Sequence, residues 1–307
     1  VSFRPWVAVA IVLTSNTQYT VDDSPVKISS TLGVAGGVTL TMQPGVEVVC
    51  LVTSCIQLHG RLQVQGSASA PVTFLCEADG CSADAVWITI LEGASAGVLS
   101  VSHAVFDGGS SQPCDTAGGV TAVKTEYAAK TSDNEFETSV LSDISARCVR
   151  FETSGGGPMA VSSGIWGLKF VNGDFNHAYL KTDYPLPAKM EVETSNFSYS
   201  TIYADDYTVE GLYLLDCGLS GVTIRVGCCQ TRFSIWNSMI CNSTLDDFND
   251  DWDIVIGGST VTNSPIRLLR GGSLEVANTT IVWDGEGIAL HLVSADHWNG
   301  LTLDKVA

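Results

Sequence analysis

The sequence predicts an all-β protein, a single-stranded parallel β-helix whose coils hold about 22 residues each. Three observations support this prediction. A short phrase recurs along the chain at nearly constant spacing, and each copy alternates apolar residues with others. No long segment follows the 3.6-residue period of an α-helix.

The repeated phrase is plainest in two stretches, MEVETSNF at 190–197 and LEVANTTI at 274–281. Both follow one template: apolar, any, apolar, any, small or polar, any, any, apolar. From residue 144 the starts lie 24, 22, 22, 21, 21 and 20 residues apart, and a copy at 120 fills the double gap after residue 99. Besides Met190 and Leu274, the copies start at Leu99, Val120, Ile144, Leu168, Leu212, Phe233 and Ile254.

Each copy is expected to begin one coil, because a second apolar pair such as Val222-Ile224 follows within the same period. The alternating apolar side chains then point into the bore, and the fifth template position takes a turn residue. A dozen coils at roughly 4.8 Å each would form a rod on the order of 55 Å long. A β-sandwich would not hold one register over six successive periods, and a leucine-rich repeat needs a Leu-x-x-Leu-x-Leu phrase that is missing.

Both ends of the chain are expected to take part in assembly. Residues 1–30 are predicted as a strand-like N-terminal arm or cap, and residues 31–307 as the β-helix. The opening VSFRPWVAVAIVL is interpreted as a strand of the mature chain, which either extends along a neighbouring subunit or folds back on its own first coil. The residues predicted to make assembly contacts are Val7, Val9, Ile11, Leu13, Leu301 and Leu303.

The charge of the chain excludes several kinds of partner. It has 33 acidic and 15 basic residues, for a net charge of −18. Nucleic acids and anionic membranes need a basic footprint, so neither is expected as a partner, and a polyanionic substrate is disfavoured. No uncharged apolar run reaches roughly eighteen residues, so insertion of a helix into a membrane is not expected.

Ten cysteines and three glycosylation sequons predict an extracellular or cell-surface glycoprotein. The gaps within the pairs Cys50/Cys55 and Cys76/Cys81 are wider than a CxxC knuckle of a zinc site, so disulfides are favoured, with the pairing left open. N-linked glycans are expected at Asn196, Asn242 and Asn278. The predicted disulfide cysteines are Cys50, Cys55, Cys76, Cys81, Cys114, Cys148, Cys217, Cys228, Cys229 and Cys241.

Residues 38–109 carry a family resemblance. The segment contains, in order, Pro44-Gly45-Val46, Gly60, Leu62-Val64-Gly66 and Pro71-Val72-Thr73-Phe74. This phrasing resembles the opening coils of extracellular right-handed β-helix proteins of the pectin-lyase-like superfamily. The resemblance implies a right-handed coil but no particular reaction, because the fold occurs in lyases, hydrolases, adhesins and surface fibres alike.

No catalytic residue is predicted. The hydrolases of that superfamily resemble one another in Asn-x-Asp, Asp-Asp, Gly-His-Gly and Arg-x-Lys motifs, and this chain has Asp205-Asp206 but neither of the last two. No cofactor is expected. The one candidate metal is a structural Ca²⁺ in the acidic stretch 246–253, for which an acidic loop without metal and a lyase site are the alternatives.

Two functional hypotheses follow. The first is a non-enzymatic structural or adhesive glycoprotein, a self-assembling homo-oligomer or filament subunit of an extracellular fibre or surface layer. The alternative is a polysaccharide-active enzyme, a lyase or glycoside hydrolase, or a carbohydrate-binding module on the same fold. Tyr213 and Trp236 are expected to point outward. Such aromatic residues contact either a sugar or another subunit.

Overall fold

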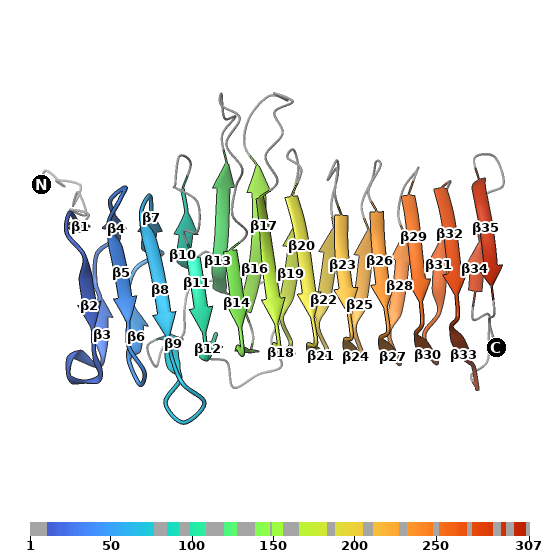
Figure 1. Ribbon diagram of the computed structural model, residues 1–307, viewed down its shortest axis with the longest axis horizontal. Coiled ribbons are helices and arrows are strands. Elements are labelled where there is room, and N and C mark those ends of the chain that lie inside the picture. Colours follow the sequence, from blue (N-terminus) through green and yellow to red (C-terminus); the bar gives the residue numbers. More distant parts are fainter. Residues whose placement is uncertain are drawn as a thin grey trace, which may run out of the picture.

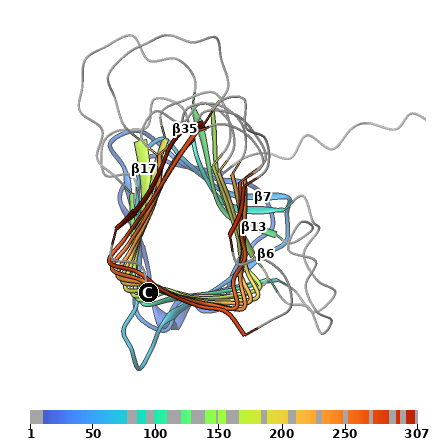
Figure 2. The same ribbon diagram turned by 90° about the vertical axis from the view of Figure 1, so that its right-hand side faces the viewer.

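The chain forms three parallel sheets that wind as one right-handed solenoid, so the predicted fold class is confirmed (Figure 1). Seen along the rod from its C-terminal end, the sheets are the three sides of a triangle (Figure 2). The computed structural model describes residues 11–76, 85–91, 99–108, 120–127, 139–147, 149–155, 166–182, 188–204, 211–226, 232–247, 252–268, 272–284, 290–292 and 298–304.

Each sheet is built from every third strand of the described chain. Sheet A contains β1 (Ile11–Leu13), β4 (Leu32–Val34), β7 (Ser54–Leu58), β10 (Val86–Ile90), β13 (Val120–Tyr127), β16 (Val149–Gly155), β19 (Tyr179–Thr182), β22 (Thr201–Ala204), β25 (Thr223–Val226), β28 (Thr244–Asp247), β31 (Ile266–Leu268) and β34 (Leu290–Leu292). Sheet B contains β2 (Thr17–Tyr19), β5 (Thr39–Met42), β8 (Arg61–Gln65), β11 (Leu99–Ser102), β14 (Ser139–Ser142), β17 (Trp166–Val171), β20 (Ala188–Glu193), β23 (Gly211–Leu215), β26 (Arg232–Trp236), β29 (Trp252–Gly257), β32 (Gly272–Ala277) and β35 (Trp298–Asp304). Sheet C contains β3 (Val26–Ile28), β6 (Glu47–Cys50), β9 (Val72–Cys76), β12 (Ala104–Asp107), β15 (Ser145–Arg147), β18 (Asp174–Asn176), β21 (Asn196–Ser198), β24 (Gly218–Ser220), β27 (Met239–Cys241), β30 (Thr260–Thr262) and β33 (Thr280–Val282).

The predicted coil position is wrong for two copies of the repeated phrase. Leu141 of β14 pairs with Val101 of β11 and Phe170 of β17, so the copy in this coil starts at Ser139 and not at Ile144. The copy at Val120 is also wrong, because β13 belongs to sheet A. Since β11 and β14 are direct neighbours, residues 99–138 make one enlarged coil, whose segments 109–119 and 128–138 lie outside the described residues.

Apolar side chains fill the bore, as the alternation predicts. The rings of Phe74 and Phe106 stack with their centroids 4.9 Å apart, and those of Phe175 and Phe197 stack at 4.5 Å. Phe151 joins the two pairs through edge contacts. Fully burying a side chain of this size contributes roughly 1.5–3 kcal/mol, so the stacked bore supplies most of the driving force for folding.

The fifth template position forms a left-handed corner between sheets B and C. Residues here have a positive φ, such as 55° at Asp216 and 50° at Asn237, a conformation that Asn, Asp and Gly adopt with the least strain. The backbone N–H of each donates to the next coil, for example from Asn237 to the Gly257 carbonyl at 2.9 Å. We call these residues the B–C corner column: His103, Asp143, Asn172, Thr194, Asp216, Asn237, Gly258 and Asn278.

From Thr194 onward, a small buried side chain with a hydroxyl or thiol follows each corner residue and bonds the backbone inside the turn. The Ser238 hydroxyl donates to the Trp236 carbonyl at 2.8 Å and accepts from the Cys217 N–H at 3.1 Å. Backbone polar groups buried without a partner are costly, so these hydroxyls stabilise the corner. The same place is taken in other coils by Ser195, Ser259 and Thr279.

The range 11–30 forms the first described coil. Ile11 pairs with Leu32, and a short 3-10 helix (Val21–Asp23) separates β2 from β3. Residues 1–10 lie outside the described residues, so an N-terminal arm there stays a prediction. Among the residues that are described, no helix has the length and apolarity needed to span a membrane.

Candidate functional site

The outer face of sheet B carries aromatic, cationic and anionic side chains on neighbouring coils. We call its middle part, from β17 to β29, the platform face. The column beside the corner runs along Val171, Glu193, Leu215, Trp236 and Gly257. The second column runs along Lys169, Glu191, Tyr213, Ser234 and Val255, and its last two residues are buried.

The indole of Trp236 lies along this face over the next strand. A Cβ atom placed on Gly257 would be 2.0 Å from Cζ3 and 2.3 Å from Cε3 of the indole, so the ring occupies the space of the missing side chain. The side chain is nevertheless 38% exposed. The predicted outward direction of Trp236 is therefore confirmed, and Gly257 is what allows the ring to lie down. The outcome is a partly accessible aromatic ring that lies over the neighbouring strand.

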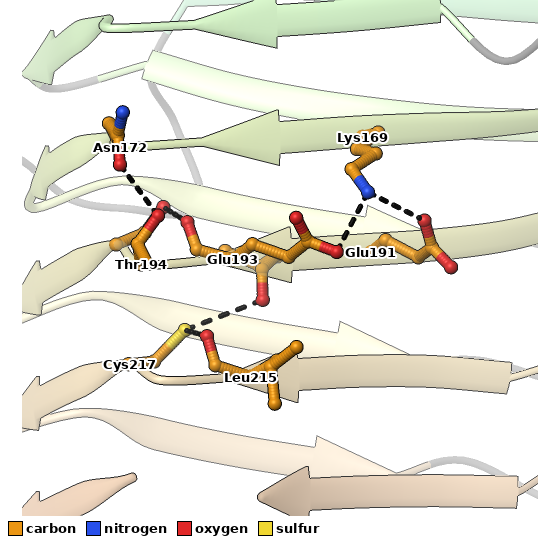
Figure 3. A network of polar contacts seen from close by, with 9 residues as sticks. Lys169, Asn172, Glu191, Glu193, Thr194, Leu215 and Cys217 are labelled. Carbon is orange, nitrogen blue, oxygen red and sulfur yellow. Dashed lines mark hydrogen bonds and ion pairs between the residues drawn. The ribbon is translucent and has the colours of Figure 1, made fainter. Parts of the chain in front are cut away.

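Charged groups lie on the same face, two coils from Trp236 for Glu191 and Glu193 and three coils from it for Lys169. The Lys169 ammonium lies 2.7 Å from Glu193 Oε1 and 3.5 Å from Glu191 Oε2 (Figure 3). The hydrogen bond to Glu193 raises the pKa of Lys169 above its usual value. Lys169 therefore stays protonated near neutral pH and is unsuited to act as a general base. The three groups together offer one hydrogen-bond donor and two carboxylate acceptors.

The B–C corner column borders the platform face with a chain of polar side chains. The Thr194 hydroxyl donates to Asn172 Oδ1 at 2.6 Å, and Asn172 Nδ2 donates to Asp143 Oδ1 at 3.3 Å (Figure 3 shows the first of these bonds). Each step spans one coil. These two hydrogen bonds fix the orientation of the three side chains, which are groups that can donate to or accept from hydroxyls.

Cys217 takes the place of a serine in the buried ladder, and its thiol is free. The Sγ atom contacts the Leu215 carbonyl at 3.3 Å and the Val192 carbonyl at 3.5 Å (Figure 3). Burial raises the pKa of the Cys217 thiol to about 11, so the group is neutral and weakly nucleophilic near neutral pH. It serves the packing of the corner and not the platform face.

The cysteines follow the prediction in part. Cys50 and Cys55 form a disulfide, whereas Cys217 and Cys241 are free thiols, so the disulfides expected at those two positions do not form. Their small side chains fill corner and strand positions that other coils give to Ser and Thr. The side chain of Cys76 and the remaining cysteines lie outside the described residues: Cys81, Cys114, Cys148, Cys228 and Cys229.

The three sequon asparagines are all exposed. Asn278 lies in the B–C corner column, and Asn242 has a φ of 47° at the corner between sheets C and A. Asn196 lies on the outer face of sheet C. Their accessibility is compatible with glycosylation, which stays a prediction.

Several other predicted sites fall, in whole or in part, on residues that the structure does not describe. Asp205-Asp206 and residues 248–251 of the acidic stretch are outside the described residues, so neither a catalytic dyad nor a calcium site is tested there. Of the predicted assembly residues, Ile11 is exposed and Leu13 packs against the core. Leu301 and Leu303 lie in β35, but their side chains are outside the described part of the structure. Val7 and Val9 are not described.

Sequence reasoning missed Gly257 and the group formed by Lys169, Glu191 and Glu193. The register of β17, β20 and β23 would have found the charged group, because Lys169 and Glu191 occupy the same template position one coil apart. Gly257 had a fainter signal: a glycine at the strand position that other coils give to Glu193, Leu215 and Trp236.

No family model matches the sequence, and no curated protein matches it either. Solved structures with a similar fold include a mannuronic acid-specific polysaccharide family 6 lyase from the human gut microbiota, at 8% identity over 91% of this chain and 82% of that one, with a TM-score of 0.32. Another is the mannuronan C-5 epimerase AlgE4 A-module of Azotobacter vinelandii, at 11% identity over 97% of this chain and 86% of that one, with a TM-score of 0.37. A third is the tailspike gp49 of the Acinetobacter baumannii bacteriophage Fri1, a capsular polysaccharide depolymerase, at 11% identity over 93% of this chain and 63% of that one, with a TM-score of 0.30. These are distant likenesses of the parallel β-helix.

Proposed function

We propose that this chain is an extracellular, adhesive β-helix glycoprotein that binds a neutral polysaccharide along the platform face of sheet B. The observation that supports this most is Trp236, whose ring lies over Gly257 and is accessible to a ligand. Aromatic surfaces of this kind combine a large apolar contact with a fixed orientation. We place the chain in the non-enzymatic branch of the pectin-lyase-like β-helices.

The charge of the face selects the class of glycan. Glu191 and Glu193 are acceptors for sugar hydroxyls, and Lys169 is already held between them. With a net charge of −18, the chain as a whole repels polyanions. Alginate and pectate are therefore expected to bind more weakly than neutral polymers. The protonated state of Lys169 supports binding over elimination chemistry.

The test is affinity electrophoresis of the glycosylated protein in gels that contain β-glucan, xylan, galactomannan, alginate or pectate. The proposal expects retardation by at least one neutral polymer and its loss in Trp236→Ala. Met239→Ala is the matched control, because Met239 is 60% exposed on the outer face of sheet C. If the wild-type protein is retarded by none of the neutral polymers, the proposed function is wrong.

End-to-end assembly is a second candidate, supported by the first strand of sheet A. Ile11 and Val12 of β1 are each 55% exposed. Pairing of β1 with the β34 strand of another copy would continue sheet A and cover these side chains. Ile11→Asp should then turn filaments into single rods in negative-stain electron microscopy. Single rods of the unchanged protein at high concentration would contradict assembly.

A further inference from the structure

A small hollow lies on the outside of the B–C corner, beside the N-terminal end of the polar column. Its volume is about 260 Å³. The floor is made by His103, Asp143 and Asn172 of the corner column, and Val105 and Ser145 of sheet C form one side. The opposite side is the loop 66–71, which connects β8 to β9. We call this hollow the corner groove.

The loop 66–71 stands out from the corner and is built to keep its shape. Six residues connect β8 to β9, whereas only residues 172 and 173 connect β17 to β18. Ser67 and Ala70 exchange two backbone hydrogen bonds of 3.1 Å, and the Ala70 carbonyl accepts from the Gly45 N–H at 3.0 Å. In Figure 1 this loop extends below the neighbouring turns. It therefore closes the corner on the N-terminal side of the groove.

The polar chain of the corner ends at the groove. Thr194 donates to Asn172, which donates to one carboxylate oxygen of Asp143. Asp143 is exposed, and its second oxygen can accept from a ligand. One coil further, His103 Nδ1 lies 2.9 Å from the Ser102 hydroxyl, which orients the ring and presents Nε2. A carboxylate and an imidazole that line one groove can accept from and donate to the hydroxyls of one sugar ring.

The remaining lining fixes the ligand class. No basic residue other than His103 lines the groove among the described residues, so Asp143 makes it unfavourable for anionic sugars. Ala68 and Pro71 supply an apolar wall. The volume lies just below the roughly 300–1,000 Å³ of sites for larger organic ligands, which suits a single sugar unit.

Resting on the proposed function, we infer that the corner groove holds the terminal sugar of a neutral glycan chain whose inner units reach Trp236. Asn237, next to Trp236, lies five coils from His103 along the corner column. At the strand spacing of a sheet this is about 24 Å, which accommodates several sugar units lying parallel to the rod. Because the loop 66–71 closes the far end, the chain stops there. The protein therefore recognises the ends of glycan chains.

The experiment compares stoichiometry with chain length. β-glucan, xylan and galactomannan are each used intact and after partial hydrolysis to shorter chains of known number-average length. Isothermal titration calorimetry then gives the amount of protein bound per gram. End recognition expects this amount to rise in proportion to the number of chain ends. Binding along the chain interior leaves it unchanged, which would overturn the inference while the proposed function stands.

Two substitutions test the groove itself. His103→Asn and Asp143→Asn keep residue types that tolerate the left-handed corner, so the fold is expected to persist. Each removes a hydrogen-bonding group that faces the terminal sugar and should weaken binding of short chains about tenfold or more, because a sugar hydroxyl is then left without its partner. Asp284→Asn, an exposed site outside the groove, is the control and should change nothing. Unaltered affinity in both groove variants would refute end recognition, whereas absence of binding by the unchanged protein would refute the proposed function and end recognition with it.

Discussion

Substituting Gly257→Ala should remove the glycan platform without touching the aromatic residue itself. The new Cβ atom would lie 2.0–2.7 Å from three carbon atoms of the Trp236 ring, so the ring must leave the sheet surface. The backbone of Gly257 does not have the positive φ of its neighbour Gly258, so alanine is accommodated there. The fold is expected to remain, with a change in unfolding free energy of about 1 kcal/mol or less.

The loss of binding can be worked out from the exposed ring. Trp236 is 38% exposed, and the surface of such a side chain is roughly 250 Å², which leaves about 95 Å² for a ligand. At about 25 cal/mol per Å² this contact contributes about 2.4 kcal/mol, which corresponds to roughly a 50-fold weaker dissociation constant in the variant. Isothermal titration calorimetry with the retarding polymer measures it.

Two further variants make the test decisive. The double variant Trp236→Ala, Gly257→Ala should bind no more weakly than either single one, because both remove the same contact. Gly258→Ala should behave in the opposite way. Its φ of 59° and a Cβ contact of 2.5 Å with Asn237 Oδ1 predict a loss of about 1–3 kcal/mol of stability with the ring still in place. Full affinity in Gly257→Ala would refute the platform.

Three other outcomes concern the solenoid that carries the face. Ser238→Ala should lower the unfolding free energy by about 1–3 kcal/mol in chemical denaturation, because it leaves the Cys217 N–H without an acceptor, whereas the exposed Ser220→Ala should be nearly neutral. Phe197→Ala should cost about 3–5 kcal/mol in the same assay, and a loss below 1 kcal/mol would contradict the stacked bore. With a thiol pKa of about 11 in the fold against 9.0 unfolded, Cys217 should lower stability progressively as the pH rises from 9 through 11, by about 2–3 kcal/mol, since the unfolded chain loses its proton first. Cys217→Ser should abolish that part of the pH dependence, and an unchanged profile would show that the thiol is not buried.

The fold was predictable because its signal is redundant. Leu212, Phe233 and Ile254 repeat one bore position, and the residues four places later, Asp216, Asn237 and Gly258, repeat one left-handed corner. The predicted register is wrong only where long segments interrupt the repeat. There Ile144 imitated the template, although the coil begins at Ser139. Local alternation cannot tell a bore residue of sheet B from one at the following corner when the period is broken.

The site was less predictable, because it depends on differences between coils. Trp236 could be assigned to the outer face from alternation alone, but its orientation depends on Gly257, one coil away. The groove depends on the loop 66–71 meeting His103 and Asp143, which are far apart in sequence. Stacking brings such residues together only after the enlarged coil is placed correctly, so the error at Ile144 also concealed this contact.

The proposed glycan binding and the proposed end recognition use different features of the outer face. A glycan that contacts only the Trp236 ring could slide along the rod, because an aromatic surface has little directional preference. The corner column adds direction, since Thr194 donates to Asn172 and Asn172 donates to Asp143, both toward the N-terminal end. The loop 66–71 then supplies the stop. Apolar contact at one end and oriented hydrogen bonds at the other fix both the position and the polarity of the chain, which neither feature achieves alone.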